Sequence, residues 1–261
     1  DDLKVRSKAE LLEMASVSWK LLQHRKPDDI NLELITPSES DGWSSQSTIV
    51  AALCADAPFL VDTIRLELNK LDIPINLIVH TGGMVVERSP AGDLQGCDFF
   101  RRSDIHHSIE APILFEIQQI TDDVFLGSLR ARLLGVIRDV LLAVRDWKPM
   151  RERMEAEIAI MTNPTTVHRP SDSKESIAFL KWLLDNHFIF LGARDYVVFG
   201  EGDDKVLQLV SGSGLGVLFD ESNSQVQRKF SELPGKAAKL MHSSDRALMI
   251  SKSNTLSSVH R

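Results

Sequence analysis

The strongest candidate for small-molecule binding in this sequence is the turn Asp56-Ala57-Pro58-Phe59-Leu60, which joins a predicted strand to a predicted helix. Leucines and isoleucines recur at helical spacing after the turn, so one face of the helix is apolar. Asp56 is predicted to cap the helix by accepting hydrogen bonds from its first N–H groups, and Pro58 has no N–H group that would need a partner there. Backbone groups at such a junction can hold a small ligand. The alternative is a structural cap with no ligand, whose apolar residues only pack in the core.

The glycine-rich stretch Gly212–Gly216 resembles part of a dinucleotide-binding loop, but its spacing differs from that motif. The motif G-x-G-x-x-G stands between a strand and a helix. Here the third glycine comes one residue early, and Val217–Phe219 reads as extended rather than helical. We therefore interpret the stretch as a turn between strands.

Metal and nucleophile chemistry have no suitable pattern either. The residues that could ligate a metal lack the C-x-x-C or H-x-x-x-H spacing of zinc sites; they are His80, Cys97, Asp104, His106 and His107. Ser108 stands beside His107 only in sequence, and no G-x-S-x-G elbow occurs. The sequence thus predicts no catalytic, cofactor-binding or metal-binding residue in this segment.

The composition is that of an ordinary globular protein. The 261 residues are 43% hydrophobic and 26% charged, with a net charge of −7. This acidic balance argues against nucleic acid as a partner, and no apolar run approaches the ~20 residues that cross a membrane. Two cysteines, Cys54 and Cys97, are too few for a disulfide framework and indicate a reducing cytoplasm. Because the sequence has no initiator methionine, we expect it to be part of a longer protein.

The hydrophobic pattern predicts three parts of α+β character. Residues 1–41 read as a helix, a short strand and a polar linker. Residues 42–162 read in the order β-α-β-β-α, which is that of a ferredoxin-like split βαβ fold with an antiparallel sheet and both helices on one face. Residues 163–261 read as a second α+β module that is cut short at its C-terminus. Trp43 stands in the polar linker and is predicted to be an interface residue, because an exposed tryptophan is costly unless it docks on a neighbour.

Five stretches, read in order, resemble the large NAD-specific glutamate dehydrogenases of bacteria. They are ADAPFLVD at 55–62, Asp146-Trp147, FLKWL at 179–183 with HFIFLG at 187–192, GSGLG at 212–216, and SKSNTLSSVHR at 251–261. The resemblance runs from about Ser18 to Arg261. Cys54 and Ala55 replace part of an aspartate-rich turn of the family, and Ala193-Arg194 stands where a Tyr-Arg pair is usual.

The resemblance implies a regulatory role by position. The N-terminal region of this family carries ACT-type modules, and the core that oxidises L-glutamate with NAD and water to 2-oxoglutarate, ammonium and NADH lies well beyond it. The lysine and aspartate expected to do that chemistry have no matching positions here, so the fragment alone is expected to be inactive. NAD is expected to bind outside this segment.

The resemblance also bears on the turn. ACT modules commonly carry Asp-x-Pro-Gly there, where glycine lets the backbone approach an amino-acid effector, and Phe59 stands in the place of that glycine. The candidate effector or interface residues are Asp56, Ala57, Pro58, Phe59, Leu60, Asp62 and Trp43.

The leading hypothesis is a non-catalytic regulatory and assembly segment of a cytoplasmic, homo-oligomeric glutamate dehydrogenase. Its partners would be its own catalytic domain, other subunits and an amino-acid effector. The alternative is a purely structural oligomerisation module with no small-molecule ligand. A third hypothesis, an independent enzyme, requires a nucleophile or metal cluster that the sequence does not contain.

Overall fold

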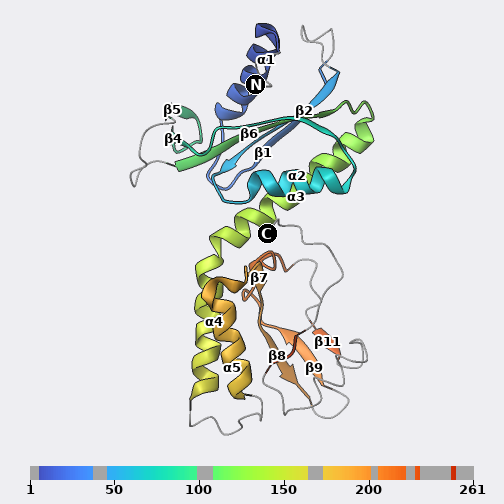
Figure 1. Ribbon diagram of the computed structural model, residues 1–261. Helices are drawn as coiled ribbons and strands as arrows, with labels where there is room; N and C mark the ends of the chain where they lie inside the picture. The colour runs from blue at the N-terminus through green and yellow to red at the C-terminus, as the bar shows by residue number, and fades with distance from the viewer. Residues whose placement is uncertain are drawn as a thin grey trace. The chain divides into compact units, whose positions relative to one another are not determined.

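A computed structural model describes residues 6–37, 46–98, 108–163, 173–200, 205–221, 227–229 and 248–250. The chain divides into two compact units, the first ending at Leu141 and the second beginning at Leu142. Both limits fall within helix α3 (Asp123–Arg145). Each unit has β-structure of its own (Figure 1). No helix in the described ranges is long and apolar enough to cross a membrane.

The first unit is built on a six-stranded antiparallel sheet in the order β1-β2-β6-β4-β5, with β3 also paired to β6. Its strands are β1 (Asn31–Ile35), β2 (Ser47–Ala55), β3 (Ile75–His80), β4 (Met84–Arg88), β5 (Leu94–Asp98) and β6 (Ser108–Gln118). The central strands β2 and β6 pair along their length, from Ser47 opposite Gln118 to Ala55 opposite Glu110.

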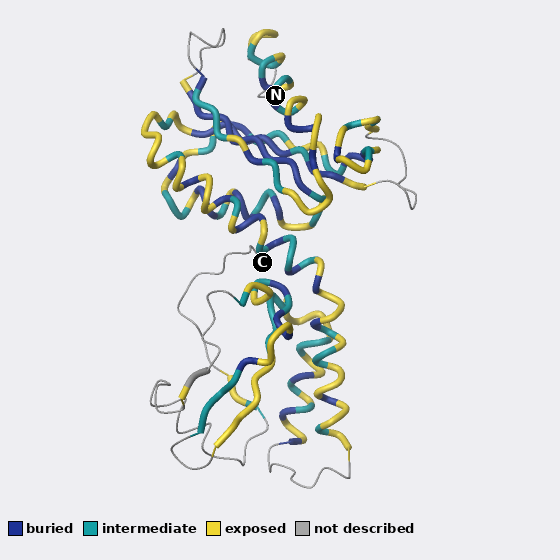
Figure 2. Tube along the Cα trace, turned by 180° about the vertical axis from the view of Figure 1, so that it is seen from behind, coloured by how far each residue is buried: buried dark blue, intermediate teal, exposed yellow. Residues whose placement is uncertain are grey.

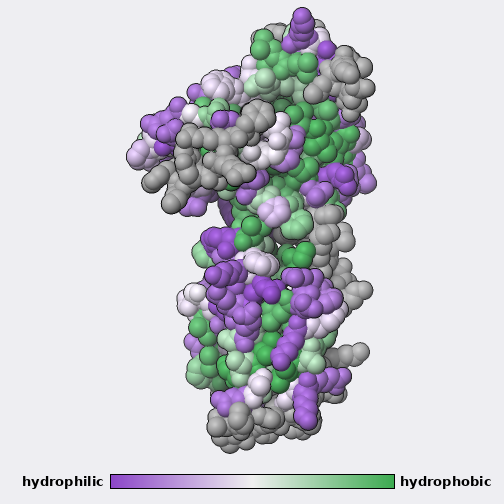
Figure 3. Space-filling view, turned by 60° about the vertical axis from the view of Figure 1, so that its left-hand side comes forward, coloured by the Kyte–Doolittle hydropathy of each residue, from purple (hydrophilic) through white to green (hydrophobic). Residues whose placement is uncertain are grey.

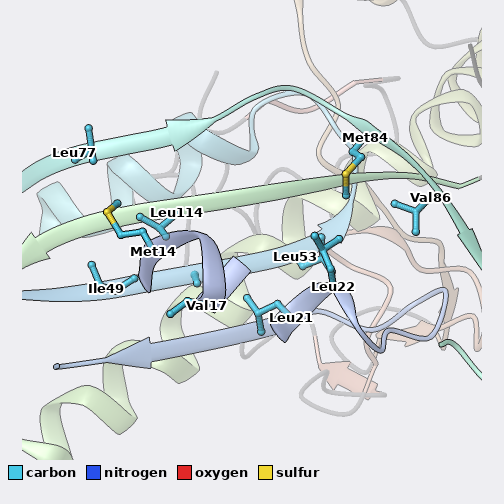
Figure 4. Packing of buried hydrophobic residues seen from close by; sticks show 11 residues of the cluster. Met14, Val17, Leu21, Leu22, Ile49, Leu53, Leu77, Met84, Val86 and Leu114 are labelled. Atoms are coloured by element: carbon cyan, nitrogen blue, oxygen red, sulfur yellow. The ribbon is translucent and has the colours of Figure 1, made fainter. Parts of the chain in front are cut away.

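Helices cover both faces of this sheet (Figure 1). Helix α1 (Lys8–Leu22) lies on one face, and α2 (Leu60–Lys70) and α3 lie on the other. Cover on both faces is needed because of β2, in which every residue from Ser47 to Cys54 is buried. A strand that is apolar on both faces is stable only when both faces are covered. Figure 4 shows the α1 side of the core, where Met14, Val17 and Leu21 pack against residues of β2 and β6.

The predicted ferredoxin-like order and the placement of α2 and α3 on one face are confirmed. The N-terminal segment is part of the same unit, because β1 pairs with β2 from Asn31 opposite Leu53 to Ile35 opposite Ile49. The boundary predicted near Asp41 falls outside the described residues, and the strands on its two sides belong to one sheet. A polar stretch of sequence indicates a loop, but a loop need not be a domain boundary. A strand as short as β1 is stable only when it pairs with a neighbouring strand.

The second unit combines two helices with short strands. Its helices are α4 (Trp147–Thr162), α5 (Ser173–Trp182) and the π-helical turn η2 (Leu183–His187), and its strands are β7 (Gly192–Ala193), β8 (Tyr196–Phe199), β9 (Val206–Leu209), β10 (Leu215–Gly216) and β11 (Gln227–Lys229). Strands β11, β9 and β8 form one antiparallel sheet in that order, and β10 pairs with β7. The limit predicted at residue 162 therefore differs from the observed one, because α4 belongs to this unit.

Candidate functional site

The turn after β2 is held against two other segments of the sheet. The N–H group of Asp56 donates a hydrogen bond of 2.9 Å to the carbonyl oxygen of Ile109 in β6. The exposed carboxylate of Asp56 lies against Gly83, between β3 and β4, because a Cβ atom on Gly83 would stand 2.5 Å from Asp56 Oδ2. The same Cβ would stand 2.5 Å from Ile109 Cγ2. Only glycine at position 83 leaves room for the carboxylate where it lies.

Phe59 adopts a left-handed backbone conformation directly before α2, with φ 71° and ψ 0°. Its carbonyl oxygen accepts the N–H group of Thr63 at 2.9 Å, and its side chain is 38% exposed. A residue with a Cβ atom is destabilised there by about 1–2 kcal/mol, whereas glycine adopts this conformation freely. The turn thus has the backbone conformation that suits glycine, although a phenyl ring is present.

The prediction that Asp56 caps α2 is wrong. The helix begins at Leu60, its N-cap residue is Phe59, and no side chain forms the capping hydrogen bond. Asp56 is held by the sheet instead, and Pro58 lies before the helix rather than within its first turn. Phe59, in its left-handed conformation, separates Asp56 and Pro58 from α2, so the first N–H groups of the helix have no side-chain cap.

The remaining residues of the turn divide between core and surface. Leu60 is 3% exposed and belongs to the core, and Ala57 is partly buried. Pro58 is exposed, and Asp62 lies partly exposed in the first turn of α2. Trp43 lies outside the described residues. Asp56, Pro58 and Phe59 are therefore the exposed residues of the turn, and Asp62 is partly exposed in the helix that follows.

This arrangement offers two complementary kinds of group. The N–H groups at the start of a helix favour a bound carboxylate, and the exposed Asp56 carboxylate favours an ammonium group. An α-amino acid carries both charges on adjacent atoms. The turn is therefore chemically suited to a zwitterionic ligand of that kind, whereas it contains no group with the arrangement of a nucleophile and its base.

A buried ionic cluster of Glu110, Arg25 and Arg88 lies next to the turn. Glu110 in β6 is fully buried and Arg25 is 2% exposed. Arg88 binds both oxygens of Glu110, from Nε at 2.6 Å and from Nη2 at 2.7 Å, and Arg25 Nη2 binds Oε1 at 3.0 Å. Burial alone would raise the pKa of Glu110, but these hydrogen bonds outweigh it and hold that pKa below its usual value.

The cluster connects the end of α1 to the strand that supports the turn. Arg88 Nη1 also donates to the carbonyl oxygen of Leu22, the last residue of α1. Glu110 stands opposite Ala55 across the ladder, and its neighbour Ile109 accepts the Asp56 N–H bond. The residue spacing could not have revealed this cluster, because its partners come from three separate segments. The only sequence signal of the cluster was the acidic residue Glu110 at the start of the apolar stretch 111–120.

The glycine-rich stretch of the second unit has a packing role. A Cβ atom on Gly216, whose φ is +59°, would lie 2.1 Å from the carbonyl oxygen of Leu191. The N–H group of Gly216 donates to Asp146 Oδ2 at 2.8 Å, and Val217 and Leu218 form a turn. Because residues 217–221, the described residues directly after these glycines, form no helix, the stretch does not have the geometry of a dinucleotide-binding loop.

Two of the five metal candidates, His80 and Cys97, lie in the described part of the chain. Within the ranges that the structure covers, no three histidine, cysteine, aspartate or glutamate residues could jointly hold a metal ion. Asp104, His106 and His107 lie outside the described residues. His80 Nδ1 is 3.4 Å from the carbonyl oxygen of Pro112, and Cys97 is exposed in β5.

The sheet order and the strand-to-helix turn define an ACT-type module. The family model described as "Glutamate dehydrogenase, ACT1 domain" matches residues 1–133, and the chain belongs to that family. A protein named NAD-specific glutamate dehydrogenase from Halomonas elongata is 34% identical over 220 residues, which cover 83% of this chain and 14% of the relative. One of the same name from Pseudomonas aeruginosa is 31% identical over 205 residues, covering 78% of this chain and 12% of the relative. The chain thus spans about one-seventh of the length of these curated relatives.

Proposed function

We propose that this chain is a regulatory and assembly segment of an NAD-dependent glutamate dehydrogenase. The match to an ACT1 family model and the name of both relatives support this proposal. The oxidation of L-glutamate and the binding of NAD belong to other parts of the parent protein. The chain itself turns over no substrate, and it works in the cytoplasm as part of a homo-oligomer.

The regulatory ligand that we propose is a free amino acid bound at the Asp56–Leu60 turn. The observation that carries the proposal is the uncapped start of α2 at Leu60, which follows the exposed residue Asp56 by four positions in the chain. The helix start would hold the α-carboxylate, and Asp56 would hold the α-ammonium group. Binding would shift the oligomer between states of different activity, which is how an effector acts on a distant catalytic site.

Calorimetric titration and thermal melting of the chain with a panel of amino acids test this proposal. A ligand at a hundred times its dissociation constant is expected to stabilise the binding unit by about 2.7 kcal/mol. Asp56→Asn is expected to abolish both the heat and the thermal shift. Asp28→Asn, which removes an exposed carboxylate from the connection between α1 and β1, is the matched control and is expected to change neither.

An absence of heat and of thermal shift with every amino acid at millimolar concentration would refute the effector proposal. The structural alternative would then be favoured, in which the Phe59 side chain belongs to a subunit interface and no ligand binds. The partial exposure of Phe59 is the specific observation in favour of that alternative. A concentration series by light scattering checks it, since a chain that stays monomeric at all concentrations contradicts assembly through this segment.

A further inference from the structure

Strand β8 of the second unit is apolar and exposed along its whole length. Tyr196, Val197, Val198 and Phe199 are 45%, 45%, 48% and 54% exposed. Successive residues of a strand point to opposite faces, so both faces of β8 are uncovered. Figure 2 shows β8 as an exposed segment beside the more buried β9, and Figure 3 shows apolar side chains at the surface of this unit.

The free edge of this strand can be located from one hydrogen bond. The N–H group of Val210 donates to the carbonyl oxygen of Asp195 at 3.0 Å, and this pair is in register with β8 and β9. Hydrogen-bonded and non-hydrogen-bonded pairs alternate along an antiparallel ladder. The backbone groups of Val197 and Phe199 therefore point towards β9, and those of Tyr196 and Val198 point away from it. No other strand of the described part lies on that side of β8.

An apolar strand with an open edge and two open faces has the character of an interior strand. Natural sheets protect their edges with charges, prolines, bulges or covering elements, and β8 has no charged residue or proline. The hairpin partner β9 is partly or fully buried, so within the β8–β9 hairpin the exposure is confined to β8. Such a strand is complete only when another strand pairs with it and further chain covers at least one face.

A second copy of the chain would satisfy only part of this requirement. Two β8 strands related by a twofold axis would pair their edges into one continuous sheet. Both faces of the joined strands would remain open to water, because each copy brings the same uncovered strand. The partner must therefore bring both a strand and a covering layer.

We propose that β8 pairs with a β-strand from the portion of the parent polypeptide that this chain does not span. This inference rests on the proposed function, in which the chain is one segment of a long dehydrogenase. The two relatives extend far beyond the matched region, which occupies 14% and 12% of their lengths, so they contain ample chain for such a strand. The added strand binds the N–H and C=O groups of Tyr196 and Val198, and apolar residues around it cover the valine and aromatic side chains.

Residue-resolved amide hydrogen exchange tests this pairing in the 261-residue chain and in its full-length parent. In the 261-residue chain we expect the Val197 and Phe199 amides to be protected by β9, and those of Tyr196 and Val198 to exchange rapidly. In the full-length parent all four are expected to be protected. The Tyr196 and Val198 amides should slow by about tenfold or more, which corresponds to about 1.4 kcal/mol against local opening.

A pair of lysine variants provides a second measurement. Val198→Lys is expected to leave the melting temperature of the 261-residue chain nearly unchanged, because the side chain is exposed there, and to lower that of the parent, where it is covered. Val124→Lys is the matched control, since Val124 in α3 is 83% exposed, and it is expected to be neutral in both proteins.

Two results would overturn the inference. Rapid exchange of Tyr196 and Val198 in the full-length parent would show that no strand pairs there. Protection that appears in the 261-residue chain and rises with its concentration would identify a second copy as the partner. Neither result depends on amino-acid binding, so failure of the effector proposal and failure of the strand pairing are distinguishable.

Discussion

Replacement of Phe59 by alanine and by glycine measures the strain in the β2–α2 turn directly. Both substitutions remove the phenyl ring, so the loss of its contacts is common to the two variants. Alanine keeps a Cβ atom at a φ of 71°, whereas glycine adopts that conformation without steric cost. Because relief of the left-handed strain outweighs the extra backbone entropy that glycine loses on folding, we expect Phe59→Gly to be more stable than Phe59→Ala by about 1 kcal/mol.

The control pair is Leu12→Ala and Leu12→Gly in helix α1, where the side chain is 65% exposed. Within a helix the preference is reversed, and glycine is expected to be less stable than alanine by about 1 kcal/mol. The difference in the free energy of unfolding between the glycine and the alanine variant should therefore have opposite signs at the two positions. This reversal distinguishes backbone strain from a general effect of removing a side chain.

Urea unfolding followed by far-UV circular dichroism supplies the measurement, with an unchanged m-value required for the comparison. Thermal melting should show the same order, with a separation of about 2–4 °C for each kcal/mol. If Phe59→Gly unfolds more easily than Phe59→Ala, as expected at Leu12, the left-handed conformation of Phe59 is refuted. The view of the turn as a glycine-type turn would fail with it.

Four further predictions concern buried groups. Glu110→Ala should lower the free energy of unfolding by about 3–5 kcal/mol, because it leaves the buried Arg25 and the largely buried Arg88 without their counter-ion, and urea unfolding would measure the loss. Folding lowers the pKa of Glu110, so the stabilisation from its ion pairs is complete above the unfolded-state pKa of about 4.3 and is lost as the pH falls through the folded-state pKa. The free energies of unfolding of wild type and Glu110→Gln should therefore converge in acid. A thiol reagent should modify the exposed Cys97 rapidly and Cys54 only after unfolding, because Cys54 is buried and burial raises the pKa of its thiol to about 12. Fast reaction of both thiols in the native chain would contradict this prediction. Gly216→Ala should destabilise the second unit by about 2–3 kcal/mol, because its Cβ atom would lie 2.1 Å from a carbonyl oxygen, and a melting curve like that of the wild type would refute the close approach.

Local patterns in the sequence were sufficient for the β-α-β-β-α elements of the first unit but not for strand β5, whose segment reads as polar and irregular. Apolar runs and helical spacing predicted the β-α-β-β-α order, because each element must bury its apolar residues. The burial of Cys54 also follows from its place in an apolar strand, and the structure confirms it. The family resemblance, which rested on short stretches in a fixed order, is confirmed by the match over residues 1–133.

The error at the turn has a local physical cause. Asp56 was a reasonable cap because aspartate is common at helix starts, and proline is tolerated in the first turn. The deciding feature was the left-handed conformation of Phe59, which a bulky residue seldom adopts. Residue preferences therefore predicted a helix that starts earlier than the observed one, and only the backbone dihedral angles identify Leu60 as the first helical residue.

The contacts that position the turn could not be predicted, because they join segments that are distant in sequence. Arg25 reaches Glu110 from the chain after α1, and Arg88 reaches it from the end of β4. Glu110 in turn belongs to the strand whose Ile109 holds Asp56. The segment before the polar linker is thus connected to the candidate binding turn through buried ion pairs and one backbone hydrogen bond.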